Sequence, residues 1–257
     1  MNQPLDGARL KVVWAQKDLD ALKDEIGTYL DTHPYEFPVE FDGDMVKAAS
    51  AVIKVEPPID LTRHLSDCLG NLRASLDYIA WTLATRYSST PPVAGKDTDI
   101  YFPIISDPDP DGNHAKRFAK MAQKYAFPTA AVDLIKSVQP YNAGYEPLKT
   151  LASLVNRDKH CLPLLTLAYA FTGTLSIIVD GVGIVSAGSA SSVCVTRHTR
   201  APEPPEQQAG NVKVDGQVTV YVSLKDSPVP KAPVDLLLGN IIKCVKDIVP
   251  RFEPFFP

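Results

Sequence analysis

The densest group of polar side chains in this chain is a pentad, residues 156–160, which is read NRDKH and directly precedes an apolar run. Within it, Arg157 and His160 are three residues apart, and residues at this spacing share one face of a helix. An arginine can hold a phosphate while a nearby histidine moves a proton near neutral pH. Arg157 and His160 are therefore candidate catalytic residues for the metal-independent cleavage of RNA.

The pentad also has a structural interpretation. A long helix is expected to begin at Asp60, and its polar side carries two i,i+4 charge pairs, Arg63 with Asp67 and Arg73 with Asp77. The charged residues of the pentad could pair with this side, and His160 could cap its own helix, where a cation suits the dipole. A third interpretation is a ligand site. The polar network or ligand site expected here consists of Asn156, Asp158, Lys159, Arg73, Asp77, His64 and Tyr141.

Zinc is a weaker interpretation of the same region. His64 and Cys68 stand at i,i+4, and His160 with Cys161 could complete a set of zinc ligands. However, successive side chains on a helix diverge by about 100°, and both cysteines adjoin apolar positions, so we expect them to be small core residues. For this reason no metal is predicted. No predicted strand is followed by GxGxxG or GxxxxGK[ST], so no nucleotide cofactor is predicted either.

A run of basic residues forms a second candidate site. Arg117, Lys120 and Lys124 share one helical face and could follow a phosphate backbone. Such runs are usually solvated surface, and only Phe118 and Tyr125 are at hand to stack on bases. The residues predicted to contact a polyanion such as RNA are Lys116, Arg117, Lys120 and Lys124.

Hydrophobic periodicity predicts the elements that position these side chains. Apolar residues at helical spacing indicate helices at residues 5–31, from Asp60 to at least Leu83, and at 114–125, 129–138, 146–160 and 232–249. Alternation around a turn at residues 42–44 predicts a hairpin at about 35–56. Pro103 predicts that the apolar residues 100–105 form an extended packing segment rather than a central strand.

After about residue 162 the pattern changes. Runs rich in β-branched residues and separated by glycine predict an antiparallel β-meander over about 163–224. The expected class is α+β, in which a helical bundle (about 1–162, with the C-terminal helix) packs with this meander. The expected organisation is a single interleaved domain over residues 1–257.

Composition narrows the class of function. The net charge of −4 gives no global attraction for nucleic acid or anionic lipid. No apolar run approaches the roughly 18 to 20 residues that span a bilayer, and the first residues lack the pattern of a secretion signal. The four cysteines form no CxxC. We expect a soluble cytoplasmic protein that does not enter a membrane. The long amphipathic helix at 5–31 is compatible with a homodimer, although a partner within the chain would serve equally well.

Four segments carry a resemblance to known proteins: RASLDYIAW (73–81), YFPI (101–104), QPY (139–141) and NRDKH (156–160). Over about residues 60–165 the chain resembles a loose group of uncharacterised bacterial proteins. Its helical part is distantly similar to HEPN domains, small helical bundles that often dimerise and often cleave RNA. The HEPN motif places a longer spacer between arginine and histidine than the two residues between Arg157 and His160. The sequence thus favours a binding or interaction protein, with an HEPN-like ribonuclease as the alternative.

Overall fold

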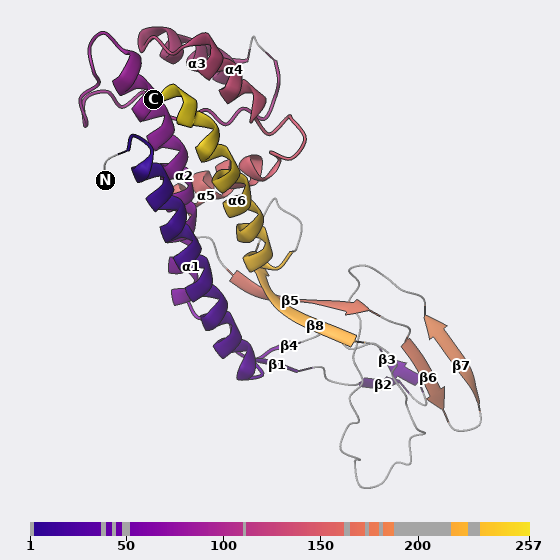
Figure 1. Cartoon of the computed structure of the whole chain (residues 1–257). Coiled ribbons are helices and arrows are strands. Elements are labelled where there is room, and N and C mark those ends of the chain that lie inside the picture. The colour runs from indigo at the N-terminus through magenta and orange to yellow at the C-terminus, as the bar shows by residue number, and fades with distance from the viewer. Residues whose placement is uncertain are drawn as a thin grey trace. The chain divides into compact units, whose positions relative to one another are not determined.

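The computed structural model describes residues 3–36, 40–42, 45–47, 52–109, 112–161, 165–172, 175–179, 182–187, 217–225 and 232–257 (Figure 1). Contacts between Cα atoms divide the chain into two compact units. We call the first the helical unit, which comprises Met1–Glu25, Ile59–Leu164 and Asp226–Pro257. The second is the strand unit, which comprises Ile26–Pro58 and Leu165–Lys225. Because the chain divides in this way, the expected single interleaved domain is not confirmed.

Helices dominate the described part of the chain. They are α1 (Asp6–Asp31), α2 (Asp60–Tyr87), α3 (Asn113–Lys124), α4 (Thr129–Ser137), α5 (Pro147–His160), α6 (Val234–Ile248) and the 3₁₀ helix η1 (Val249–Phe255). The α-helices confirm those expected from hydrophobic periodicity; α2 continues four residues beyond Leu83, and the other predicted ends differ by no more than two residues. None of the described helices is long and apolar enough to cross a membrane.

The centre of the helical unit is α2. Its apolar stripe is buried along the whole helix, at Leu61, Leu65, Leu69, Leu72, Leu76, Ile79 and Leu83. α2 contacts α5, α6 and η1. On another side it runs antiparallel to α1, because Ser75 Oγ donates to the carbonyl of Ala8 (2.9 Å) while Asn71 Nδ2, one turn earlier in α2, donates to Asp18 Oδ2 (2.9 Å). α2 is therefore the scaffold on which the rest of the unit packs.

Residues 100–105 form the extended, buried segment that Pro103 predicted, and side chains satisfy its backbone. Phe102 N donates to Asp77 Oδ1 (2.9 Å), and Arg73 Nη2 donates to the carbonyl of Phe102 (2.8 Å). Buried polar backbone groups need partners, and here α2 supplies them in place of a neighbouring strand. The Phe102 ring, itself fully buried, meets Phe252 of η1 edge to face at 6.1 Å.

A second side chain holds the same segment from the other end. Gln139, fully buried after α4, accepts from Ile105 N (2.7 Å) and donates from Nε2 to the carbonyls of Pro103 (3.1 Å) and Ile135 (2.8 Å). We call Arg73, Asp77 and Gln139 the clamp. It fixes the backbone of residues 102–105 against α2 and α4.

The strand unit contains antiparallel pairs. In its first part, β1 (Tyr35–Glu36) pairs with β4 (Val52–Ile53), and β2 (Glu40–Asp42) pairs with β3 (Met45–Lys47). These two pairs give the chain reversal that the alternating pattern predicted around residues 42–44. The hydroxyl of Tyr29, near the end of α1, donates to the carbonyl of Val55 just after β4 (2.5 Å).

The later strands do not confirm a meander. β5 (Leu165–Thr172) pairs with β8 (Gln217–Leu224), and β6 (Leu175–Val179) pairs with β7 (Val182–Ala187). In a meander each strand would pair with its neighbour in sequence, whereas β5 pairs with the last strand. The described strands therefore form separate two-stranded pairs, and the structure supports the class α+β without that finer topology.

Candidate functional site

The pentad lies at the end of α5, beside α2. Ser66 Oγ of α2 donates to Asp158 Oδ1 at 2.7 Å. Asn156, Lys159 and His160 are exposed, and Arg157 is half-buried. The hydrogen bond from Ser66 joins the last turn of α5 to α2, on which the charge pairs Arg63–Asp67 and Arg73–Asp77 also lie, and the pairing of the pentad with those charges stays a prediction. Whether Arg157 and His160 act together on RNA stays a prediction.

The other residues of the expected polar network do not gather in one place. Arg73 and Asp77 form a two-bond ion pair (Nη2 to Oδ1 2.7 Å, Nε to Oδ2 3.1 Å) and belong to the clamp. Burial raises the pKa of Asp77, while Arg73, the Phe102 N–H and the charge of Lys159 act to lower it. Tyr141 is exposed, and its hydroxyl donates to the carbonyl of Lys136 (3.3 Å). Lys159 therefore links the pentad electrostatically to the clamp.

His64 belongs to the contact between α1 and α2. Its Nε2 lies 2.9 Å from Glu25 Oε1 and 3.0 Å from Arg63 Nη2, and its buried Nδ1 has no hydrogen-bond partner among the described residues. Cys68 is buried as expected, and burial raises the pKa of its thiol to about 12. Cys161 is exposed, so its expected core position is wrong, because it follows the last turn of α5. Within the ranges that the structure describes, no three His, Cys, Asp or Glu side chains are placed to hold a metal ion.

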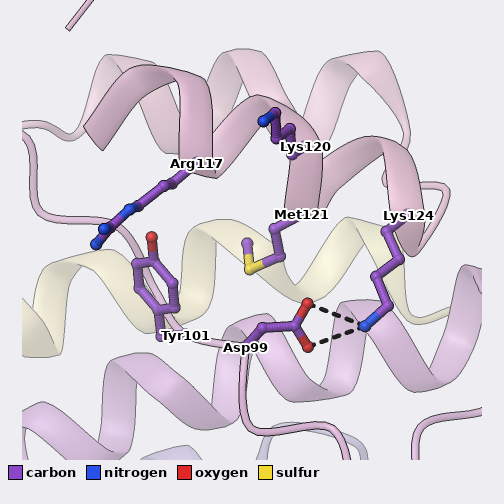
Figure 2. Close-up of a pocket in the computed structure, with 6 residues that line it drawn as sticks. All are labelled: Asp99, Tyr101, Arg117, Lys120, Met121 and Lys124. Carbon is purple, nitrogen blue, oxygen red and sulfur yellow. Dashed lines mark hydrogen bonds and ion pairs between the residues drawn. The ribbon is translucent and has the colours of Figure 1, made fainter. Parts of the chain in front are cut away.

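The basic residues of α3 border the candidate site, a pocket of about 430 Å³ (Figure 2). We call it the basic pocket, and its lining residues are Asp99, Tyr101, Arg117, Lys120, Met121 and Lys124. Three of the four residues predicted to contact a polyanion line it, and Lys116 does not. The pocket lies within the helical unit, between α3 and the segment that precedes Phe102.

The sequence of α3, NHAKRFAKMAQK, explains the charge of this wall. Phe118, Met121 and Ala122 are buried, and Arg117 and Lys124, four residues before and three residues after Met121, flank it on the side of the helix that faces the pocket. The twelve residues of α3 include no acidic residue. The facing wall is fixed by the clamp, since Tyr101 directly precedes Phe102, whose N–H and C=O are both bonded to α2. Figure 2 shows Arg117 and Lys124 reaching down from opposite ends of α3, with Tyr101, Met121 and Asp99 between them.

The Lys124 end of the pocket is neutralised by two carboxylates. Lys124 Nζ lies 2.9 Å from Asp99 Oδ2 and 3.6 Å from Asp97 Oδ1. The hydroxyl of Tyr125 lies 2.7 Å from Asp99 Oδ1 and 3.0 Å from Asp97 Oδ1. Hydrogen bonds from Tyr125 and Lys124 lower the pKa of Asp99, and the backbone N–H of Val93 is the main cause of the lowered pKa of Asp97. Both carboxylates are therefore charged at neutral pH.

Replacing Tyr125 by phenylalanine is expected to raise the pKa of Asp99 toward its ordinary value, because a hydrogen bond to the charged form is lost. A depressed pKa contributes stability above the ordinary value of about 3.9, and this contribution is lost as pH falls through the depressed value. The stability of the variant should therefore fall less at acid pH. The carboxyl ¹³C resonance of Asp99, followed against pH, measures the shift. Tyr141→Phe is the control, and an unchanged Asp99 midpoint in Tyr125→Phe would contradict the expectation.

The other end of the pocket is cationic. Arg117 and Lys120 are exposed, and neither has a hydrogen bond or ion pair with any residue that the structure describes. Figure 2 shows Arg117 beside Tyr101 at one end of the pocket, Met121 in the middle and Asp99 at the far end, while the Lys120 side chain lies on the upper side of α3. Such an arrangement can bind an anion at the Arg117 end and a hydrogen-bond donor at the Asp99 end.

Periodicity located the cations of this site but missed Asp99, Tyr101 and Met121. One signal was available for Tyr101, because it lies between the apolar residues Ile100 and Phe102, which are buried, so in an extended segment its side chain points the other way. Nothing in the sequence pairs Asp99 with Lys124, which are 25 residues apart. A search of protein-family models, of curated proteins and of solved structures finds no match to this chain.

Proposed function

We propose that this chain is a binding protein and that the basic pocket holds an anionic ligand. One observation carries the proposal: Arg117 and Lys120, which have no ionic partner among the described residues, both belong to the lining of a pocket of about 430 Å³. A pocket of this volume is in the range of small-molecule sites, about 300 to 1,000 Å³. Since the whole chain is acidic, a local cluster of cations is what would attract an anion to this point.

The location we infer is the cytoplasm. Three cysteines, Cys68, Cys161 and Cys244, are free thiols among the described residues. Unpaired cysteines are typical of a reducing compartment. The proposed ligand is therefore a small anion of the cell interior.

Titration with inorganic pyrophosphate tests this function. We expect binding that weakens as salt is raised, because the contact is electrostatic and exposed. Arg117→Ala and Lys120→Ala should each weaken binding by about tenfold or more, the effect of losing one charge-assisted hydrogen bond. Isothermal titration calorimetry gives the affinity, and ¹H–¹⁵N chemical shifts show whether the perturbed amides belong to α3.

Lys243→Ala is the matched control, because Lys243 is an exposed lysine on a different helix, α6. Its affinity for pyrophosphate should equal that of the unchanged protein. Equal losses in Lys243→Ala and in the two pocket variants would refute the proposal, as would the absence of any binding at low salt.

A further inference from the structure

The geometry of the basic pocket points to a chemical class of ligand: a nucleoside monophosphate whose base carries an exocyclic amino group. This inference rests on the proposed function, since it concerns the same pocket. It depends on the order of groups along the pocket, which is the Arg117 guanidinium, the Tyr101 ring, the Met121 side chain and the Asp99 carboxylate (Figure 2). No single small ion satisfies all of them.

Size favours a ligand longer than an inorganic anion. A water molecule occupies about 30 Å³ of liquid, so a pocket of about 430 Å³ is many times larger than one tetrahedral anion needs. Arg117 and Lys124 are seven residues apart on α3, which at 1.5 Å per residue corresponds to roughly 10 Å. The ligand must therefore be elongated, with an anionic end and a body that reaches Asp99.

The anionic end fits a phosphate monoester. Arginine binds phosphate through parallel N–H donors, and lysine adds a point charge. Arg117 and Lys120 supply one of each, and both are free of other ion pairs within the described part of the chain.

The middle of the pocket fits a planar ring. Tyr101 presents an aromatic ring that is only partly exposed, and the buried Met121 contributes a polarisable thioether beside it. Aromatic side chains stack on nucleobases of every kind, and methionine sulfur contacts ring edges favourably. The clamp holds the backbone next to Tyr101, so this ring stands in place before the ligand arrives.

The far end selects for an amino group. Asp99 Oδ1 is already bonded to Tyr125 and Lys124, but its Oδ2 accepts only from Lys124 among the described residues, and the side chain is 51% exposed. A carboxylate oxygen has room for a second donor. Adenine N6 and cytosine N4 donate hydrogen bonds, whereas uracil and hypoxanthine present a carbonyl oxygen there. A carbonyl facing Asp99 would be repelled.

Paired nucleotides provide the test. AMP should bind about tenfold more tightly than IMP, and CMP about tenfold more tightly than UMP, because each pair differs by one charge-assisted hydrogen bond. Calorimetry on the full chain measures the four affinities beside that of pyrophosphate. Binding of AMP no tighter than IMP, with pyrophosphate still bound, would overturn the inference and leave the proposed function standing. If neither pyrophosphate nor any nucleotide bound, both proposals would fall.

Two variants separate the contacts. Asp99→Asn should abolish the preference of AMP over IMP, since an amide can donate to the carbonyl of IMP as well as accept from AMP. Tyr101→Leu should weaken AMP severalfold and by a larger factor than pyrophosphate, because only the base stacks on the ring. A preference for AMP that persisted in Asp99→Asn would contradict the assigned orientation.

The nucleotide can be free or part of a single strand, and length distinguishes the two. A hexamer of adenylate that binds more tightly than AMP, with a steeper dependence on salt, identifies a strand as the source, because further phosphates then contact α3. Equal affinity per nucleotide identifies the free monophosphate. A hexamer of inosinate that binds as tightly as the adenylate hexamer would count against the inference for either source.

Discussion

Replacing Leu72 by alanine is expected to lower the free energy of unfolding by about 2 to 5 kcal/mol. Leu72 lies at the middle of the α2 stripe and is fully buried. The substitution removes apolar atoms from a helix that contacts α5, α6 and η1, and neighbours on several helices cannot all collapse into the space left behind. Urea denaturation followed by the helical circular dichroism signal measures the loss.

Leu236→Ala provides the matched control. Leu236 is a leucine on α6 that is 60% exposed, so the same chemical change there should alter stability by less than about 0.5 kcal/mol. If the Leu72 variant melted like the Leu236 variant, α2 would not be the scaffold of the helical unit.

The second large effect is expected at Gln139. Replacing it by alanine should cost about 2 to 4 kcal/mol, because the buried amide is bonded to three backbone groups and its removal leaves Ile105 N–H and the carbonyl of Pro103 without partners. Since these groups lie in the core, water compensates them poorly. The same denaturation measurement applies, and hydrogen exchange at the Ile105 amide should accelerate at the same time.

Gln123→Ala is the control for this change, because Gln123 is an exposed glutamine on α3. Its stability should match that of the unchanged protein. A Gln139 variant with unchanged stability and unchanged exchange at Ile105 would show that other groups hold residues 103–105 in place.

The periodicity of apolar residues predicted the helices well. It predicted the polar contacts poorly, because these join segments that are far apart in the sequence. A buried stripe such as Leu61–Leu83 repeats every three or four residues, so its period alone reveals the helix. The clamp brings together Arg73, Asp77, Phe102 and Gln139, whose contacts depend on how separate segments pack rather than on any period. Three of the four segments that carried the resemblance, RASLDYIAW, YFPI and QPY, meet in this clamp, which gives them a structural role that no spacing rule could predict.

The basic residues of α3 were predicted as one stripe, and the structure divides them. Lys124 is paired with Asp99 and Asp97, whereas Arg117 and Lys120 have no ionic partner among the residues described. Charge along a sequence indicates which residues are cationic, but not which of them remain uncompensated after folding. That difference decides where an anion can bind. Strand pairing shows the same limit, because β5 pairs with β8 across a long stretch of chain, which alternation within each strand cannot reveal.

Tyr101, which lines the pocket, directly precedes Phe102, whose backbone is held by the clamp. The peptide of Phe102 is anchored to the interior through Asp77 and Arg73, and the next side chain toward the N-terminus is a wall of the pocket. The backbone beside Tyr101 therefore loses little conformational entropy when a ligand binds. Binding should therefore carry little cost for ordering the backbone beside Tyr101, whereas the exposed side chains of Arg117 and Lys120 must still be ordered by the ligand.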